Sequence, residues 1–243
     1  MISRRASILA GMILTFATAS VCHGRSLEVR IDSLTTLGMD TTRSFDDRVL
    51  SYKAAIKLGK SGVPMFRLAS LYMQKGTRND LSDSEYWYKG AIAHDRQNAV
   101  YRCAYAKLLW NLDDLAGANS QAKKALEINP DNLCGLYYAG KYAIWGMDRN
   151  LTAVALASSK QVVVPFSLRE FGEDRMSQAI HLLSRALEID PDFGDARQTL
   201  GLVYYESEQY DEVIDLFAEG ARRDLDDPNS FFFIGLALQA QKN

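Results

Sequence analysis

One phrase occurs twice in this chain, because AKKALEINPDN at residues 122–132 is followed by LSRALEIDPDF at residues 183–193. Small residues near the ends of four amphipathic stretches keep the same phase: Ala91, Ala125, Ala186 and Ala221. Their spacings are 34, 61 and 35 residues. A fixed spacing of this length is typical of a chain built from repeated supersecondary units.

A second series of small residues gives the same period independently. It falls in the middle of the intervening stretches and comprises Ala69, Ala106, Gly140, Gly201 and Gly235. The spacings are 37, 34, 61 and 34 residues, so both series lengthen at the same place. The long interval exceeds the 34-residue interval by 27 residues, which predicts an insertion at about residues 147–173 within one repeat.

The composition agrees with a helical, folded chain. Only five prolines and 16 glycines occur in 243 residues, and alternating β-branched residues are scarce. The 28 basic and 30 acidic residues nearly balance, so the charge gives no indication of nucleic acid or an anionic membrane surface as a partner. The sequence therefore predicts an all-α protein without a nucleic-acid partner.

The two best-defined units resemble tetratricopeptide repeats (TPRs), in which a pair of antiparallel helices spans 34 residues. They cover residues 99–130 and 192–224, and Pro130 and Pro191 stand where one unit ends. The resemblance implies an α-solenoid of antiparallel helix pairs, a TPR-like superhelix, over residues 45–243 with one inserted arm. In each unit the small mid-helix residue would let the second helix approach closely, so these positions serve packing rather than chemistry.

The first 24 residues read as a signal peptide. Arg4 and Arg5 precede an apolar stretch that is too short to span a bilayer, and small residues follow it. This predicts a secreted or periplasmic protein without a membrane span after cleavage. Cys22 keeps lipoprotein anchoring open as an alternative, although Val21 is larger than the residue that usually precedes a lipidated cysteine. Residues 25–44 lack a strong period and are expected to form a loose lead-in.

No catalytic or metal-binding residues, and no cofactor, are predicted. The three histidines are His23, His94 and His181, and none has the neighbours of a metal site. Cys103 and Cys134 lie 31 residues apart in the first helices of successive units. They could form a disulfide after export or stay as two buried thiols.

Binding is the remaining function, and the TPR resemblance implies a concave groove lined by the first helix of each unit. We call the alignment of the units on their 34-residue period the repeat frame, or the frame for short. The residues that it assigns to this peptide-binding groove are Lys107, Trp110, Tyr137, Lys141, Trp145, Gln198 and Tyr205. Lys107 and Lys141 are frame equivalents, and we expect both to be exposed side by side. Together with the tryptophans they predict a site for an acidic or C-terminal peptide. The alternative is two solvated lysines and two tryptophans that pack between repeats.

Two further segments are candidates for contacts. The insertion contains QVVVPFSL at residues 161–168, which suits an extended arm that packs on the repeats or meets a partner. The last helix carries FFFIGLAL at residues 231–238, an apolar face that predicts either a continuing chain or self-association.

Two classes of function stay open. The first is a non-catalytic, exported scaffold that binds a protein or peptide through its groove and arm. The second is the N-terminal repeat region of a larger envelope-assembly protein or enzyme whose active domain lies beyond residue 243. FGEDRMSQAIHLLSRALEIDP, at residues 171–191, is similar to the repeat region of exported bacterial proteins with a GWxTD domain, although no GWxTD string occurs in the chain.

Overall fold

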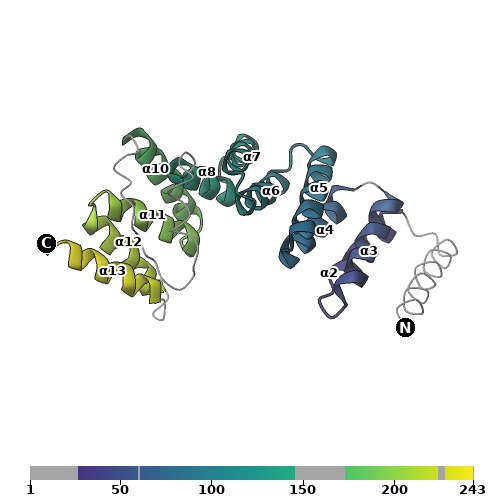
Figure 1. Ribbon diagram of the computed structural model, residues 1–243, viewed down its shortest axis with the longest axis horizontal. Helices are drawn as coiled ribbons and strands as arrows, with labels where there is room; N and C mark the ends of the chain where they lie inside the picture. The colour runs from purple at the N-terminus through teal and green to yellow at the C-terminus, as the bar shows by residue number, and fades with distance from the viewer. Residues whose placement is uncertain (1–26, 60, 146–172, 224–227, 243) are drawn as a thin grey trace. The chain divides into compact units, whose positions relative to one another are not determined.

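The computed structural model describes residues 27–59, 61–145, 173–223 and 228–242, and the chain divides into two compact units at Arg96 and Gln97. The described part of unit 1 contains four helices, coloured purple to blue in Figure 1. They are α2 (Leu27–Met39), α3 (Phe45–Leu58), α4 (Gly62–Lys75) and α5 (Arg78–His94). Helix α2 packs on α3, and α4 packs on α5, so the described residues of unit 1 form two helix pairs.

Unit 2 contains seven described helices that run from teal to yellow in Figure 1. They are α6 (Ala99–Asn111), α7 (Leu115–Ile128), α8 (Leu133–Trp145), α10 (Glu173–Ile189), α11 (Gly194–Glu206), α12 (Tyr210–Arg223) and α13 (Pro228–Ala240). Helices α6 and α7 form one pair, α8 and α10 the next, and α12 contacts both α11 and α13.

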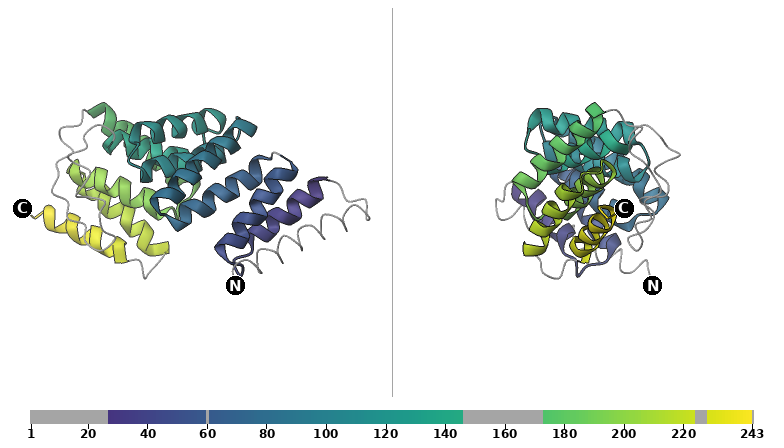
Figure 2. Two further views of the ribbon diagram at one scale, coloured as in Figure 1. Left: turned by 45° about the vertical axis from the view of Figure 1, so that its right-hand side comes forward. Right: turned by 90° about the vertical axis from the view of Figure 1, so that its left-hand side faces the viewer.

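The predicted fold class is confirmed. Every element in the described part of the chain is a helix, and successive helices pack as antiparallel pairs (Figure 2). The two helices that flank residues 146–172 pack on each other, so the repeat closes between α8 and α10 as the 34-residue frame predicts. The residues predicted to form the inserted arm, like residues 1–24 with the predicted signal peptide, lie outside the described residues.

The expectation of a loose lead-in at residues 25–44 is wrong for most of that segment. Residues Leu27–Met39 form α2, which pairs with α3 and is packed so closely that a Cβ at Gly38 would meet the Tyr52 ring at 2.6 Å. The period was hard to see because α2 leaves several apolar side chains exposed, including Leu27 and Met39. The helix at residues 45–58 is therefore the second member of a helix pair.

Local sequence explains where the helices begin and end. Ser44 and Thr77 accept hydrogen bonds from the backbone N–H groups of Asp47 and Asp80, which satisfies donors that the first turn leaves free. Gly76 ends α4 in the left-handed conformation, with φ of 74°, where glycine carries little steric cost. Pro130 and Pro191 each follow the last residue of a helix by two positions.

Small residues of the frame allow the helices of a pair to approach closely. A Cβ at Gly140 would meet the Leu183 side chain of α10 at 3.0 Å, and one at Gly201 would collide with the Phe217 ring of α12. Leu183 and Phe217 are both buried to 1% exposure or less. Gly140 and Gly201 thus mark contacts between paired helices, as the repeat period predicts.

None of the described helices is both long and apolar enough to cross a membrane.

Candidate functional site

The most unusual polar group in unit 2 is the Lys141 side chain on α8. Lys141 is only 9% exposed, although lysine is seldom buried to this extent. Its Nζ donates a hydrogen bond to the Tyr137 hydroxyl at 3.1 Å, one helical turn earlier on the same helix. A charged amine at this depth needs compensating contacts, because burial removes most of its hydration.

Aromatic rings supply part of that compensation. The Lys141 Nζ lies 4.6 Å from the centre of the Trp110 ring and 5.1 Å from the centre of the Tyr137 ring. Both distances are within the range in which a cation is attracted to an aromatic face. Trp110 comes from α6, so the contact joins the first helices of two successive repeats.

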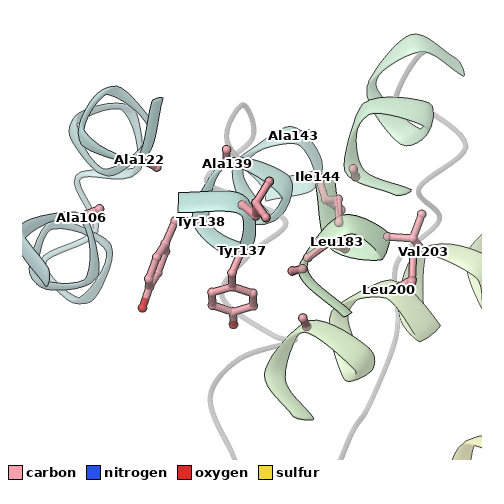
Figure 3. Packing of buried hydrophobic residues seen from close by; sticks show 14 residues of the cluster. Ala106, Ala122, Tyr137, Tyr138, Ala139, Ala143, Ile144, Leu183, Leu200 and Val203 are labelled. Carbon is pink, nitrogen blue, oxygen red and sulfur yellow. The ribbon is translucent and has the colours of Figure 1, made fainter. Parts of the chain in front are cut away.

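More rings surround this pair. Tyr138 packs against Trp110 with ring centres 5.8 Å apart, and Tyr137 packs against Phe193, at the start of α11, at 5.3 Å. Figure 3 shows the rings of Tyr137 and Tyr138 on the same side of α8 with their hydroxyl groups pointing the same way. We call Trp110, Tyr137, Tyr138, Lys141 and Phe193 the aromatic–lysine cluster.

Burial governs the ionisation of the cluster. Desolvation lowers the pKa of Lys141 to about 8, and the negative charge of Asp195 on α11 partly opposes this shift. Desolvation, reinforced by Asp195, raises the pKa of Tyr137 to about 12, while a hydrogen bond with Thr199 acts in the opposite direction. The pKa of Tyr138 is raised as well, mainly by burial. Near neutral pH the cluster therefore holds protonated tyrosines beside a lysine that is close to its titration range.

The expectation that Lys107 and Lys141 are both exposed is wrong for Lys141. Lys107 is exposed on α6, as expected, whereas its frame equivalent is buried. The difference arises because Lys141 lies between α6 and α11, whose Trp110 ring and Asp195 charge act on it. Two equivalent positions of the frame thus carry the same residue in different surroundings.

The structure places the other predicted groove residues as follows. Gln198 is half-buried on α11, and Tyr205, on the same helix, packs its ring against Tyr210 at 5.5 Å. Trp145 is the last residue of α8, and its side chain lies outside the described residues. Of the seven predicted positions, Trp110, Tyr137 and Lys141 are brought into direct contact.

Three members of this neighbourhood were not among the predicted site residues. They are Tyr138, Phe193 and Thr199, the last of which is 5% exposed. Tyr138 directly follows a predicted residue, and the frame gave no reason to place both in one cluster. Phe193 precedes α11, so a repeat pattern defined only for helix positions could not include it.

Cys103 and Cys134 form a disulfide that joins α6 to α8. Their Cα atoms are 5.9 Å apart, a separation that a disulfide spans readily. The bridge lies in a small apolar cluster with Ala99 and Ala125. Of the two alternatives that the sequence left open, the structure contains the bridge rather than two free thiols.

In the described part of the chain, no group of three or more His, Cys, Asp and Glu side chains is arranged to hold a metal ion. His94 and His181 lie on α5 and α10, in different units.

Comparison with protein families identifies one match. Residues 170–231 match the tetratricopeptide repeat family, and this segment includes α10, α11, α12 and the first turn of α13. No curated protein matches the chain.

Several solved structures share the fold. The chain is similar to PilF of Pseudomonas aeruginosa, with a TM-score of 0.67, 13% identity, and coverage of 89% of this chain and 87% of the other. YrrB, described as a TPR protein with an unusual peptide-binding site, gives a TM-score of 0.59 at 16% identity and covers 94% and 98%. A MamA protein gives 0.57 at 18% identity and covers 82% and 94%.

These similarities, with the family match, support a TPR protein and confirm the TPR-type helical solenoid. Proteins of this fold are generally scaffolds that bind protein or peptide partners. The described geometry adds a specific feature, a lysine held among aromatic rings where three first helices meet.

Proposed function

We propose that this chain is a non-catalytic scaffold of the TPR type that binds a protein or peptide through the first helices of unit 2. The aromatic–lysine cluster carries the proposal. A buried lysine usually costs stability relative to an apolar residue of the same size, so it is an expensive way to fill a core. A role in ligand binding would explain why a lysine, and not an apolar residue, occupies this buried position.

The cluster favours a ligand that presents a carboxylate next to an aromatic or apolar side chain. An ammonium group in a partly dehydrated site can make charge-assisted hydrogen bonds to a carboxylate, each contributing about 1.5–3 kcal/mol. The Trp110 and Tyr137 rings offer apolar surface beside it. Lys141 is the proposed anchor, and Lys107, Trp145, Gln198 and Tyr205 are proposed as surrounding contacts.

The first experiment identifies a ligand and tests the carboxylate at the same time. The purified chain would be used as bait for envelope extracts, and a pool of short peptides with free C-terminal carboxylates would be compared with the same pool in amidated form. Amidation removes the charge and little else. We expect it to weaken binding about tenfold or more, because a charged hydrogen bond is lost.

A pair of variants assigns that effect to one lysine. Lys141→Met keeps an unbranched side chain, one atom shorter, but removes the charge, so it should abolish the difference between free and amidated peptides. Lys107→Ala is the matched control on the exposed frame equivalent and should keep most of the difference. If folded Lys141→Met protein still binds free peptides more tightly than amidated ones, Lys141 is not the anchor. The arm at residues 147–173 would then be the next candidate for the binding site.

Export to the periplasm or outside the cell is a further part of the proposal. The signal-like residues 1–24 and the Cys103–Cys134 bridge both support it, because disulfides persist mainly in oxidising compartments. Cell fractionation, with alkylation of free thiols before lysis, tests this directly. A cytosolic protein with two alkylated cysteines would contradict it, and a palmitate-labelled form would support anchoring through Cys22.

The arm at residues 147–173 is proposed as a second contact for the partner. Because α8 and α10 pack on each other, deleting residues 150–170 should leave the repeats folded while weakening binding. Loss of the whole helical signal on deletion would make the arm a part of the core.

A second candidate function is the repeat region of a larger envelope-assembly protein or enzyme. The likeness of residues 171–191 to the repeat region of GWxTD proteins favours it. The reading frame beyond codon 243 distinguishes the two: a stop codon favours the scaffold, and a continuing frame with an enzyme domain favours the alternative. Self-association through residues 231–238 is proposed as a property separate from ligand binding.

A further inference from the structure

The Cys103–Cys134 bridge and the aromatic–lysine cluster lie on the same line of contact between two helices. We call this line, along which α6 meets α8, the α6–α8 seam. Cys103 precedes Trp110 by seven residues on α6. Cys134 precedes Lys141 by seven residues on α8. Seven residues make about two helical turns, so each cysteine shares a helix face with the cluster residue that lies about 10 Å further along the axis. The bridge and the Trp110–Lys141 contact therefore join the same two faces.

The next seam, between α8 and α11, shows that the positions of the two cysteines normally face each other. The repeat frame places Tyr137 of α8 at the position of Cys103. It places Asp195 of α11 at the position of Cys134. Burial, and after it the negative charge of Asp195, raise the pKa of Tyr137, so these two side chains are close in space. The same pair of positions thus meets in both seams, and in the α6–α8 seam a covalent bond joins it.

The two seams differ in how accurately their second contact must be aligned. At the positions of Trp110 and Lys141, the α8–α11 seam has Ile144 and Leu202, which pack in the apolar core. Apolar packing is not directional. The Lys141 Nζ, by contrast, lies 4.6 Å from the centre of the Trp110 ring. Attraction of a cation to a ring extends to about 6 Å, so a displacement of the ring by roughly 1.5 Å is enough to weaken it. The bridge therefore occurs in the seam that needs the more accurate alignment.

Opening the bridge changes the spacing of the two helices. Bonded sulfur atoms lie closer than their nonbonded contact distance, so reduction forces them apart by roughly 1.5 Å. Cys103 is 4% exposed and lies in a cluster with Ala99 and Ala125. Close packing in such a cluster leaves the thiols little space to turn away from each other. The helices therefore take up part of the separation, and its size is comparable to the displacement that moves the Trp110 ring off Lys141.

We propose that the Cys103–Cys134 bridge is a positioning element of the aromatic–lysine cluster, because it holds α6 against α8 so that the Trp110 ring stays over the Lys141 ammonium. Recognition of a carboxylate at Lys141 then depends on the redox state of the bridge. This second statement rests on the proposed function, whereas the first does not. Reduction by a dithiol breaks the S–S bond and transfers two electrons and two protons to the cysteine sulfurs, while the dithiol is oxidised to a disulfide.

The primary test observes the Lys141 side chain by NMR without any ligand. In a chain with isotope-labelled lysine, the ring current of Trp110 should displace the ε-methylene signal of Lys141 upfield of that of Lys107, its exposed frame equivalent. Lys141→Met identifies the signal by its absence. We expect a dithiol reductant to remove most of the displacement that Trp110 causes and reoxidation to restore it. The Lys107 signal should stay in place.

Trp110→Leu tests whether the bridge acts through the ring. In this variant the oxidised chain gives the position of the Lys141 signal when the ring is absent. Reduction should move the wild-type signal toward this position and leave the signal of the variant nearly unchanged, because both changes remove the same contact. Equal movements in the wild type and the variant would mean that the bridge affects Lys141 by another route, and would overturn the proposal.

Peptide binding tests the dependence on redox state. The expected preference for free over amidated peptides, about tenfold in the oxidised chain, should fall to about threefold or less after reduction. The double variant Cys103→Ala, Cys134→Ala should show the low preference without any reductant, and adding reductant should not change it. A preference that responds to the reductant in this variant would show that the reagent acts elsewhere.

Circular dichroism accompanies each measurement, because α7 packs on both α6 and α8 and should keep the helices paired after reduction. A reduced chain with its helical signal intact and an unmoved Lys141 signal would make the bridge a stabilising cross-link only, and would overturn the proposal. Should reduction remove the helical signal, the double alanine variant in a stabilising osmolyte supplies the folded chain, and an unmoved signal there is equally decisive.

The two readouts distinguish this proposal from the proposed function. A Lys141 signal that moves on reduction, in a chain that never prefers free peptides, would support the positioning role and refute the carboxylate site. A clear preference for free peptides that reduction does not alter would support the carboxylate site and overturn its dependence on the bridge.

Discussion

Lys107 and Lys141 occupy the same position in successive repeats, but they differ in exposure and in the side chains that contact them. Lys107 is exposed on α6, whereas Lys141 on α8 is buried, bonded to the Tyr137 hydroxyl and placed over the Trp110 ring. The backbone position is the same in both cases. The neighbouring side chains differ. The repeat frame therefore determines the position of a residue on its helix, and the adjacent repeats determine what surrounds its side chain.

The largest difference between the two lysines should appear on charge reversal. Lys141→Glu would bury a carboxylate where the ammonium now contacts aromatic rings, near the like charge of Asp195, and should destabilise unit 2 by about 3 kcal/mol or more. Lys107→Glu, at an exposed position, should change stability by less than about 0.5 kcal/mol. Urea denaturation followed by circular dichroism measures both. Equal effects would mean that the two sites do not differ in environment.

A smaller and more specific difference concerns pH. The pKa of Lys141 falls from 10.5 to about 8 on folding, so below pH 8 the folded protein carries the full cost of a buried charge. Between pH 8 and pH 10.5 the unfolded chain keeps a proton that the folded chain has released, so the contribution of Lys141 to stability rises with pH by roughly 3 kcal/mol in total.

The measurement compares the wild type with Lys141→Met in urea at pH 7 and pH 9.5. We expect the wild type to gain stability relative to the variant over this interval, and the comparison cancels contributions from the tyrosines that both proteins share. A constant difference between wild type and Lys141→Met would contradict a lowered pKa.

The smallest effect is expected at Asp195. Its negative charge raises the pKa of Lys141, so Asp195→Asn should move the midpoint of that pH dependence further down, by less than about one pH unit. Asp192→Asn, also exposed but absent from the groups that shift Lys141, serves as the control. An upward movement in Asp195→Asn would show that the carboxylate does not act on the lysine.

The fold was predictable because its determinants are local and periodic. The small residues at Ala106, Gly140 and Gly201 mark where paired helices approach, and the longer interval between Gly140 and Gly201 predicted that one pair would close across an insertion. The pairing of α8 with α10 bears this out. Helix α2 was not predicted in the same way, because its exposed apolar residues reduce the difference in polarity between its two faces.

The candidate site was predictable only in part. The frame placed Trp110, Tyr137 and Lys141 on one set of helices, and the structure brings them into contact. The repeat frame could not predict the burial of Lys141, because that burial also depends on side chains outside the frame positions, such as Phe193. The Cys103–Cys134 pair shows the same limit, because spacing alone did not decide between a bridge and two free thiols.

The sequence by itself thus determined the helical class, the repeat length and the pairing of helices. A helix period and a close-approach glycine are properties of a short stretch of chain and can be read from it. Only the tertiary structure decided that Lys141 is buried while Lys107 is exposed, and that Phe231 of α13 is exposed while Leu136, at the equivalent position of α8, is buried. Exposure and pKa depend on which distant segments lie within a few ångströms, and a repeated motif leaves that undetermined because identical units can have different neighbours.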